Sequence, residues 1–129
     1  MPPLLEAQLR SALAEHRRQA EAQVSALTAQ LDDIVDSTRF VATDDEHDPD
    51  GSTVGFERAK IAALLDAAWA RLAEVEAVLE RMETGRYGTC EGCGEPIAHE
   101  RLLARPVATR CVACAAASPR QAPRSARHC

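Results

Sequence analysis

The chain has 129 residues, among them five cysteines but only two Phe, one Trp and one Tyr, and its formal net charge at pH 7 is −5. With so few large rings, the composition argues against a wide catalytic or ligand-binding cavity and favours closely packed, alanine-rich helices. The charge is unevenly spread: residues 1–86 hold 17 acidic and 9 basic side chains, whereas residues 87–129 hold 3 acidic and 6 basic. An acidic body is therefore followed by a basic end.

The first predicted element is a long helix over residues 4–40, preceded by Pro2 and Pro3. Proline is tolerated at a helix start, where its missing N–H would have no partner. Apolar residues then recur every three or four positions, the spacing of a buried stripe on a helix. The stripe lacks a large apolar residue at His16-Arg17-Arg18, so we expect looser packing there. Its members are Leu9, Leu13, Ala20, Val24, Leu27, Leu31, Ile34 and Val35.

An acidic segment, residues 41–52, interrupts this pattern with Pro, Gly and five carboxylates but no Lys or Arg. We expect a turn here, with Ser52 or Thr53 as the N-cap of the next helix. The charges could simply keep the turn solvated, or they could engage a metal ion or a basic channel in a partner. The candidate partner-binding tip lies within residues 43–51. Its acidic residues are Asp44, Asp45, Glu46, Asp48 and Asp50.

A second long helix is predicted over residues 53–84, and Gly85 follows it at a position that favours a left-handed C-terminal residue. Two such helices joined by about a dozen residues should fold into an antiparallel hairpin, or coiled coil, roughly 45–50 Å long. Trp69 is expected to pack against the first helix rather than to anchor a partner. The apolar stripe of this second helix is Ile61, Leu64, Leu65, Ala68, Leu72, Val75, Leu79 and Met82.

Two Cys-x2-Cys pairs separated by 17 residues, Cys90/Cys93 and Cys111/Cys114, have the spacing of a four-cysteine zinc site. Four thiolates fill the tetrahedral coordination of zinc and leave no position for water or substrate. The expected cofactor is therefore one structural Zn²⁺ ion. Gly92 and Gly94 flank Cys93 and should permit a tight turn in which backbone amides face sulfur.

The predicted organisation is mainly α: a helical hairpin over residues 1–86, a four-cysteine zinc finger over 87–115 and a disordered basic tail over 116–129. We find no basic-then-apolar leader and no apolar run long enough to span a membrane, which favours a cytoplasmic location. The chain has no phosphate-binding glycine loop, nucleophile elbow or paired helical histidines, so we do not expect an enzyme. Three arginines in the tail are a weak basis for nucleic-acid binding.

The residues around the cysteines resemble a known family. The stretches Gly85-Arg86-Tyr87-Gly88-Thr89-Cys90-Glu91-Gly92-Cys93-Gly94-Glu95-Pro96-Ile97, Arg101-Leu102-Leu103-Ala104-Arg105-Pro106 and Cys111-Val112-Ala113-Cys114 resemble the DksA/TraR C4-type zinc-finger family. The resemblance implies a regulator that binds bacterial RNA polymerase, with the coiled coil in the secondary channel and the acidic tip near the catalytic centre. It implies no direct recognition of promoter DNA.

Two departures from the family pattern alter what the resemblance implies. The tip matches the family's Asp-Pro-x-Asp-x-Ala motif at Asp48 and Pro49, but Gly51 stands at the second aspartate and Thr53 at the alanine. We do not expect a binding site for the alarmone ppGpp, because the later part of the second helix is rich in Ala and Glu and Pro119 interrupts any helix after the finger. Two other functions remain open: a zinc-stabilised adaptor for another protein, and a redox sensor whose zinc thiolates are oxidised.

Overall fold

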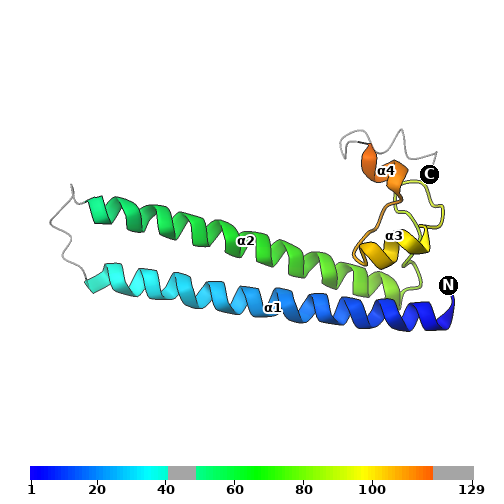
Figure 1. Ribbon diagram of the computed structural model, residues 1–129, viewed down its shortest axis with the longest axis horizontal. Helices are drawn as coiled ribbons and strands as arrows, with labels where there is room; N and C mark the ends of the chain where they lie inside the picture. The colour runs from blue at the N-terminus through cyan, green and yellow to red at the C-terminus, as the bar shows by residue number, and fades with distance from the viewer. Residues whose placement is uncertain (41–48, 118–129) are drawn as a thin grey trace. The chain divides into compact units, whose positions relative to one another are not determined.

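Four helices make up the regular structure of the described part of the chain. The computed structural model describes residues 1–40 and 49–117, and over these residues it contains no strand, only an isolated bridge between Thr89 and Pro96. None of the described helices combines the length and the apolar character that crossing a bilayer requires. The helices are α1 (Pro3–Phe40), α2 (Pro49–Glu83), α3 (His99–Ala104) and α4 (Val112–Ala116) (Figure 1).

Both long helices agree with the predicted ranges except at the start of α2. This helix begins at Pro49, four residues before the predicted start, so Ser52 and Thr53 lie inside it and the N-cap prediction is wrong. Proline suits the first helical position because its φ angle is already helical and its missing N–H would have no partner there. The composition of residues 49–52 indicated a turn, but Pro49 and Asp50 also suit the first turn of a helix.

The chain divides into two compact units. The finger unit consists of Met1–Arg17 and Glu74–Cys129, and the arm unit consists of Arg18–Ala73. In the finger unit Arg10 pairs with Glu83 at 3.0 Å and Arg17 with Glu76 at 3.5 Å, so α1 and α2 run antiparallel there. These ion pairs are exposed and contribute on the order of 0–1 kcal/mol each. These ion pairs are therefore a minor source of stability for this unit.

The arm unit holds one segment of each long helix, and the two segments run side by side in opposite directions (Figure 1). Among its described residues, Ala20, Ile61, Ala68 and Leu72 are buried and apolar. Trp69, predicted to pack against the first helix, is 53% exposed, so it is at most partly covered. Trp69 directly follows Ala68, and successive helical residues point about 100° apart, so the tryptophan lies outside the buried stripe.

In the finger unit, helical and finger residues share one hydrophobic core. From the helices come Leu9 and Leu13 of α1 and Val78 and Met82 of α2. The finger contributes Ile97, Leu102, Ala108 and three of its cysteines, Cys90, Cys111 and Cys114. The four cysteine positions are thus built against the ends of the long helices.

Candidate metal centre

The first cysteine pair lies in a tight loop after α2. The Cys90 N–H donates to the Glu95 carbonyl at 2.8 Å, and the Gly94 N–H donates back to the Cys90 carbonyl at 2.9 Å. Gly94 has φ +80°, a backbone conformation that residues with a side chain rarely adopt. The Gly92 N–H faces the Cys90 sulfur at 3.4 Å. Gly94 therefore permits the tight turn, and the amide of Gly92 faces a cysteine sulfur, as the sequence predicts.

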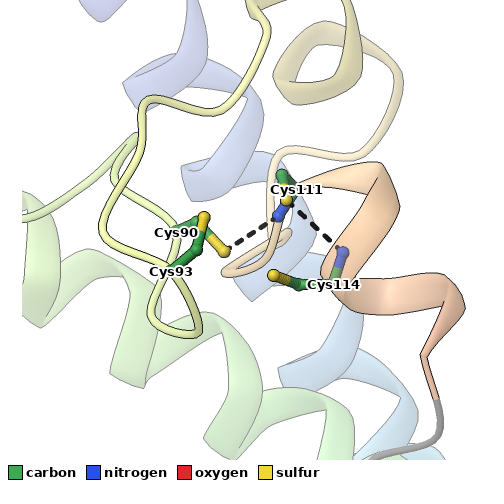
Figure 2. A group of neighbouring side chains, drawn as sticks. All are labelled: Cys90, Cys93, Cys111 and Cys114. Carbon is green, nitrogen blue, oxygen red and sulfur yellow. Dashed lines mark hydrogen bonds between the residues drawn. The ribbon is translucent and has the colours of Figure 1, made fainter. Parts of the chain in front are cut away.

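The second cysteine pair lies at the start of α4. Cys111 is the N-cap of this five-residue helix, and its sulfur accepts a hydrogen bond from the Cys114 N–H at 3.4 Å. The Cys111 N–H in turn donates to the Cys90 sulfur at 3.3 Å, which joins the two loops (Figure 2). Backbone amides thus face the sulfur atoms, an arrangement that favours thiolates.

The four cysteine sulfurs meet in one small space. All lie within 4.8 Å of one another (Figure 2). Four sulfurs placed tetrahedrally about 2.3 Å from a zinc ion would be about 3.8 Å apart, so the donor set fits zinc in number, type and spacing. Cys93 and Cys111 are also close enough to pair as a disulfide. That pairing would use two of the four sulfurs, whereas one zinc ion uses all four.

Electrostatics also favours a cation between the sulfurs. Burial acts to raise the pKa of Cys90, but hydrogen bonds from the N–H groups of Cys111, Cys93 and Gly92 lower it below the usual value. The pKa of Cys114 is raised, first by burial and then by its hydrogen bond to Cys90. The backbone amides therefore favour the thiolate form of Cys90. A second thiolate, at Cys114, is opposed by burial and by its interaction with Cys90. Several thiolates here need a metal ion to balance their charge.

A polar network connects the two loops with the end of α2. Arg81 donates to the carbonyls of Arg86 at 3.1 Å and Thr89 at 2.7 Å, directly before the first cysteine. Glu91, between the first two cysteines, accepts from the Thr109 hydroxyl at 3.2 Å and from Arg110 at 3.5 Å. The network therefore fixes the first loop against both α2 and the segment that leads into the second pair.

Comparison with known proteins matches residues 85–120 to the prokaryotic dksA/traR C4-type zinc finger. The structure is similar to that of the transcription factor DksA2 from Pseudomonas aeruginosa, with a TM-score of 0.73 and 28% sequence identity. This likeness covers 87% of this chain and 81% of that one. The chain carries a DksA/TraR C4-type zinc finger.

Curated relatives are similar mainly over the finger. The RNA polymerase-binding transcription factor DksA of Haemophilus influenzae is 44% identical over 41 residues, 32% of this chain and 28% of the relative. The protein of the same name from Caulobacter vibrioides is 49% identical over 41 residues, 32% of this chain and 29% of the relative. The uncharacterized protein YteA of Bacillus subtilis is 39% identical over 74 residues, 57% of this chain and 31% of the relative. The chain thus spans about a third of the length of the curated relatives it matches.

Within this DksA/TraR-type finger, the structure brings the four predicted cysteines together. The tip residues Asp44, Asp45, Glu46 and Asp48 lie outside the described residues, and Asp50 falls in the first turn of α2 with its side chain outside the description. The predicted tail over 116–129 lies largely outside the described residues, which end at Ala117.

Sequence reasoning missed the residues that support the finger. Arg81 belongs to no sequence motif, although it donates to two carbonyls in the finger. Arg101 belongs to the family motif and donates to the Arg110 carbonyl at 2.7 Å, just before Cys111. Tyr87 belongs to the same motif, and its hydroxyl donates to the Pro106 carbonyl at 2.8 Å. An arginine or tyrosine within a zinc-finger motif is a usable signal, because such loops expose many carbonyls that need donors.

Proposed function

We propose that this protein binds RNA polymerase and regulates transcription. In the finer form of the proposal, its helical arm enters the secondary channel and its acidic tip approaches the catalytic centre. The observation that carries the proposal is the likeness to the transcription factor DksA2, because it covers 87% of this chain and so includes the long helices as well as the finger. A likeness confined to the finger would fit many kinds of zinc protein.

In this proposal Cys90, Cys93, Cys111 and Cys114 hold one zinc ion, and the ion is structural. All four donors come from the protein, so the metal keeps no position for a substrate. Three of these cysteines belong to the same core as the ends of α1 and α2. Zinc binding would therefore stabilise the helix ends together with the finger.

The physical character of the arm supports insertion into a partner. Its two helical segments pack on each other through buried apolar residues, so little conformational entropy is lost when the arm binds. The five carboxylates within residues 43–51 could then interact with a metal-containing, basic centre. The protein would act in the cytoplasm as a regulator rather than an enzyme, without reading promoter sequence and without a ppGpp site.

A binding experiment with bacterial core RNA polymerase tests the proposal. The zinc-loaded chain should bind the polymerase and change transcript yield in vitro on several promoters. A tip variant should lose the transcriptional effect and keep its fold, because the substitutions remove charge without shortening the chain. This variant carries Asp44→Asn, Asp45→Asn, Glu46→Gln, Asp48→Asn and Asp50→Asn.

A matched control separates the tip from overall charge. It neutralises five exposed carboxylates of the arm helices and should behave like the unaltered chain. If the control loses activity as strongly as the tip variant, the effect belongs to net charge and the tip proposal is wrong. If the unaltered chain does not bind polymerase, the function itself is wrong. The control substitutions are Asp32→Asn, Asp33→Asn, Asp36→Asn, Glu57→Gln and Asp66→Asn.

A further inference from the structure

The last turn of α2 presents one charged side chain to the first cysteine loop. The side chain of Arg81 is only 17% exposed, although it carries a charge. Its Nη2 group donates to the Thr89 carbonyl at 2.7 Å and to the Arg86 carbonyl at 3.1 Å, and its Nη1 lies 4.0 Å from a carboxylate oxygen of Glu91. Thr89 and Glu91 are the two neighbours of Cys90 in the chain. The guanidinium therefore contacts the loop on both sides of a cysteine.

These contacts help to fix the direction in which the Cys90 side chain leaves the backbone. In the preceding peptide, the Thr89 carbonyl accepts from Arg81, and the N–H donates to the Glu95 carbonyl at 2.8 Å. The following peptide is held by the Gly94 N–H, which donates to the Cys90 carbonyl at 2.9 Å. A peptide is rigid and planar, so holding both peptides fixes the torsion angles at Cys90 and hence its Cα–Cβ bond. Arg81 supplies the one of these bonds that comes from α2.

The backbone of Arg81 also takes part in ending the helix. Its carbonyl accepts from the Arg86 N–H at 2.9 Å and from the Thr84 hydroxyl at 3.1 Å. Gly85, between these two residues, has φ +77°, so the chain turns here and brings the Arg86 carbonyl to the guanidinium of the same arginine. One residue thus holds the last turn of α2 with its carbonyl and the cysteine loop with its side chain. Ordering one of these segments should therefore order the other.

Glu91 extends the contact to the second cysteine loop. Its other carboxylate oxygen accepts from the Thr109 hydroxyl at 3.2 Å and from Arg110 at 3.5 Å. Arg110 directly precedes Cys111. A carboxylate between two guanidinium groups is attracted by both, and the partial burial of Arg81 and Arg110 reduces screening by solvent. The polar contacts therefore run from α2 to residues beside both cysteine pairs.

We propose that Arg81 is a positioning residue of the metal centre and couples metal binding to the end of α2. It acts through the backbone of Cys90 rather than as a ligand. Coupling between two events is reciprocal, so zinc strengthens the last turn of α2 by the same factor as the ordered turn strengthens zinc binding. The inference rests on the zinc site of the proposed function and is independent of polymerase binding.

The first test measures the zinc affinity of the full-length chain by competition with a chromophoric chelator. Arg81→Met keeps an unbranched apolar stem but removes every donor, so it should weaken zinc binding at least about tenfold. Arg81→Lys keeps the charge and loses the planar fork, so it should weaken binding about threefold. If Arg81→Met lacks the helical circular dichroism of the unaltered chain at saturating zinc, Arg81→Lys replaces it in every comparison.

Arg86→Met is the matched control for charge. It removes the same charge from an exposed side chain just after the same turn and leaves the Arg86 carbonyl in place as an acceptor. The zinc affinity should change by less than about twofold, because exposed charges contribute little.

The second test separates positioning from a general loss of stability. At saturating cobalt(II), the visible absorption bands report tetrahedral coordination by sulfur, and Arg81→Met should keep the bands of the unaltered chain. Amide hydrogen exchange then follows the N–H groups of Thr84, Gly85 and Arg86, which bond to carbonyls in the last turn of α2. Zinc should slow their exchange at least about fivefold in the unaltered chain and less than about twofold in Arg81→Met. A general loss of stability would instead speed exchange equally with and without zinc.

Each other result overturns the inference in a distinct way. Equal losses of affinity in Arg81→Met and Arg86→Met would mean that only positive charge near the metal matters. Unchanged affinity or unchanged zinc-dependent protection in Arg81→Met would leave the zinc site intact and Arg81 without a role in it. Altered cobalt bands would mean that Arg81 is needed to assemble the ligand set, not to couple it to α2. No zinc binding by the unaltered chain would overturn both this inference and the proposed zinc site.

Discussion

The shared core of the finger unit predicts that adjacent leucines of α3 behave very differently when shortened. Leu102 is fully buried in the core that contains Leu9, Met82 and three cysteines, whereas Leu103 is 46% exposed. Leu102→Ala removes buried apolar atoms and leaves a cavity, so it should lower the free energy of unfolding by about 2–5 kcal/mol. Leu103→Ala should change it by no more than about 0.5 kcal/mol. A small domain has a net stability of only about 5–15 kcal/mol, so the first change is large.

Urea denaturation at saturating zinc, followed by far-ultraviolet circular dichroism, measures both values. Fluorescence of the single tryptophan is a poor choice, because Trp69 is half-exposed and lies in the arm unit. The Leu102 variant should also bind zinc more weakly in a chelator competition, because three of the cysteine positions depend on the same core. Equal losses of stability in the two variants would refute the shared core, as would an unchanged zinc affinity in the Leu102 variant.

Three further predictions concern the metal, the tyrosine and the glycines. Cys111→Ser, or removal of zinc by a chelator, should unfold the finger and lower the helical content of the chain. Zinc stoichiometry measures the loss of metal, and circular dichroism measures the helical content. An unchanged helical content after zinc is lost would contradict a structural role for the ion. Burial raises the pKa of Tyr87 to about 12. A raised pKa in the folded state gives stability that is present below pH 10 and is lost as the pH rises toward 12. The phenolate absorbance of this single tyrosine should therefore titrate near pH 12 in the folded chain and near pH 10 in urea. Replacement by Phe should remove this pH dependence. Gly94→Ala should destabilise the chain by roughly 1–3 kcal/mol because of its positive φ, whereas Gly55→Ala in α2 should stabilise it by up to about 1 kcal/mol, both measured by thermal unfolding.

The sequence was sufficient to predict the two long helices and the cysteine cluster, because both depend on local spacing, but not the short helices α3 and α4 inside the finger. Leu9 and Leu13 belong to the predicted stripe of the first helix and are buried. The cysteines converge because two Cys-x2-Cys turns each direct a pair of thiols toward a common centre. A periodic pattern and a short loop motif both act over a few residues, which is the range over which sequence alone is informative.

Side chains near the edge of a buried stripe could not be predicted in the same way. Leu64 was assigned to the stripe of α2 but is 46% exposed, and Val78 was left out of the stripe but is buried. Val78 lies in the core that includes finger residues, so its burial depends on a segment distant in sequence. Leu64 lies in the arm unit, beside a groove rather than beneath another segment. Tertiary contacts decide such positions, and periodicity carries no information on them.

The composition of the finger unit has a consequence for the order of events during synthesis. Leu9 and Leu13 of α1 belong to the same core as Leu102 and Cys111, which are about 90 residues later in the chain. At roughly 5–20 residues per second, these leucines leave the ribosome on the order of 5–20 s before their partners exist. Val78 and Met82 of α2 can cover part of the apolar side of the nascent first helix, but the rest stays uncovered until the last cysteine pair emerges and metal can bind. Zinc supply would then set the moment at which the newly made chain is protected from aggregation and proteolysis.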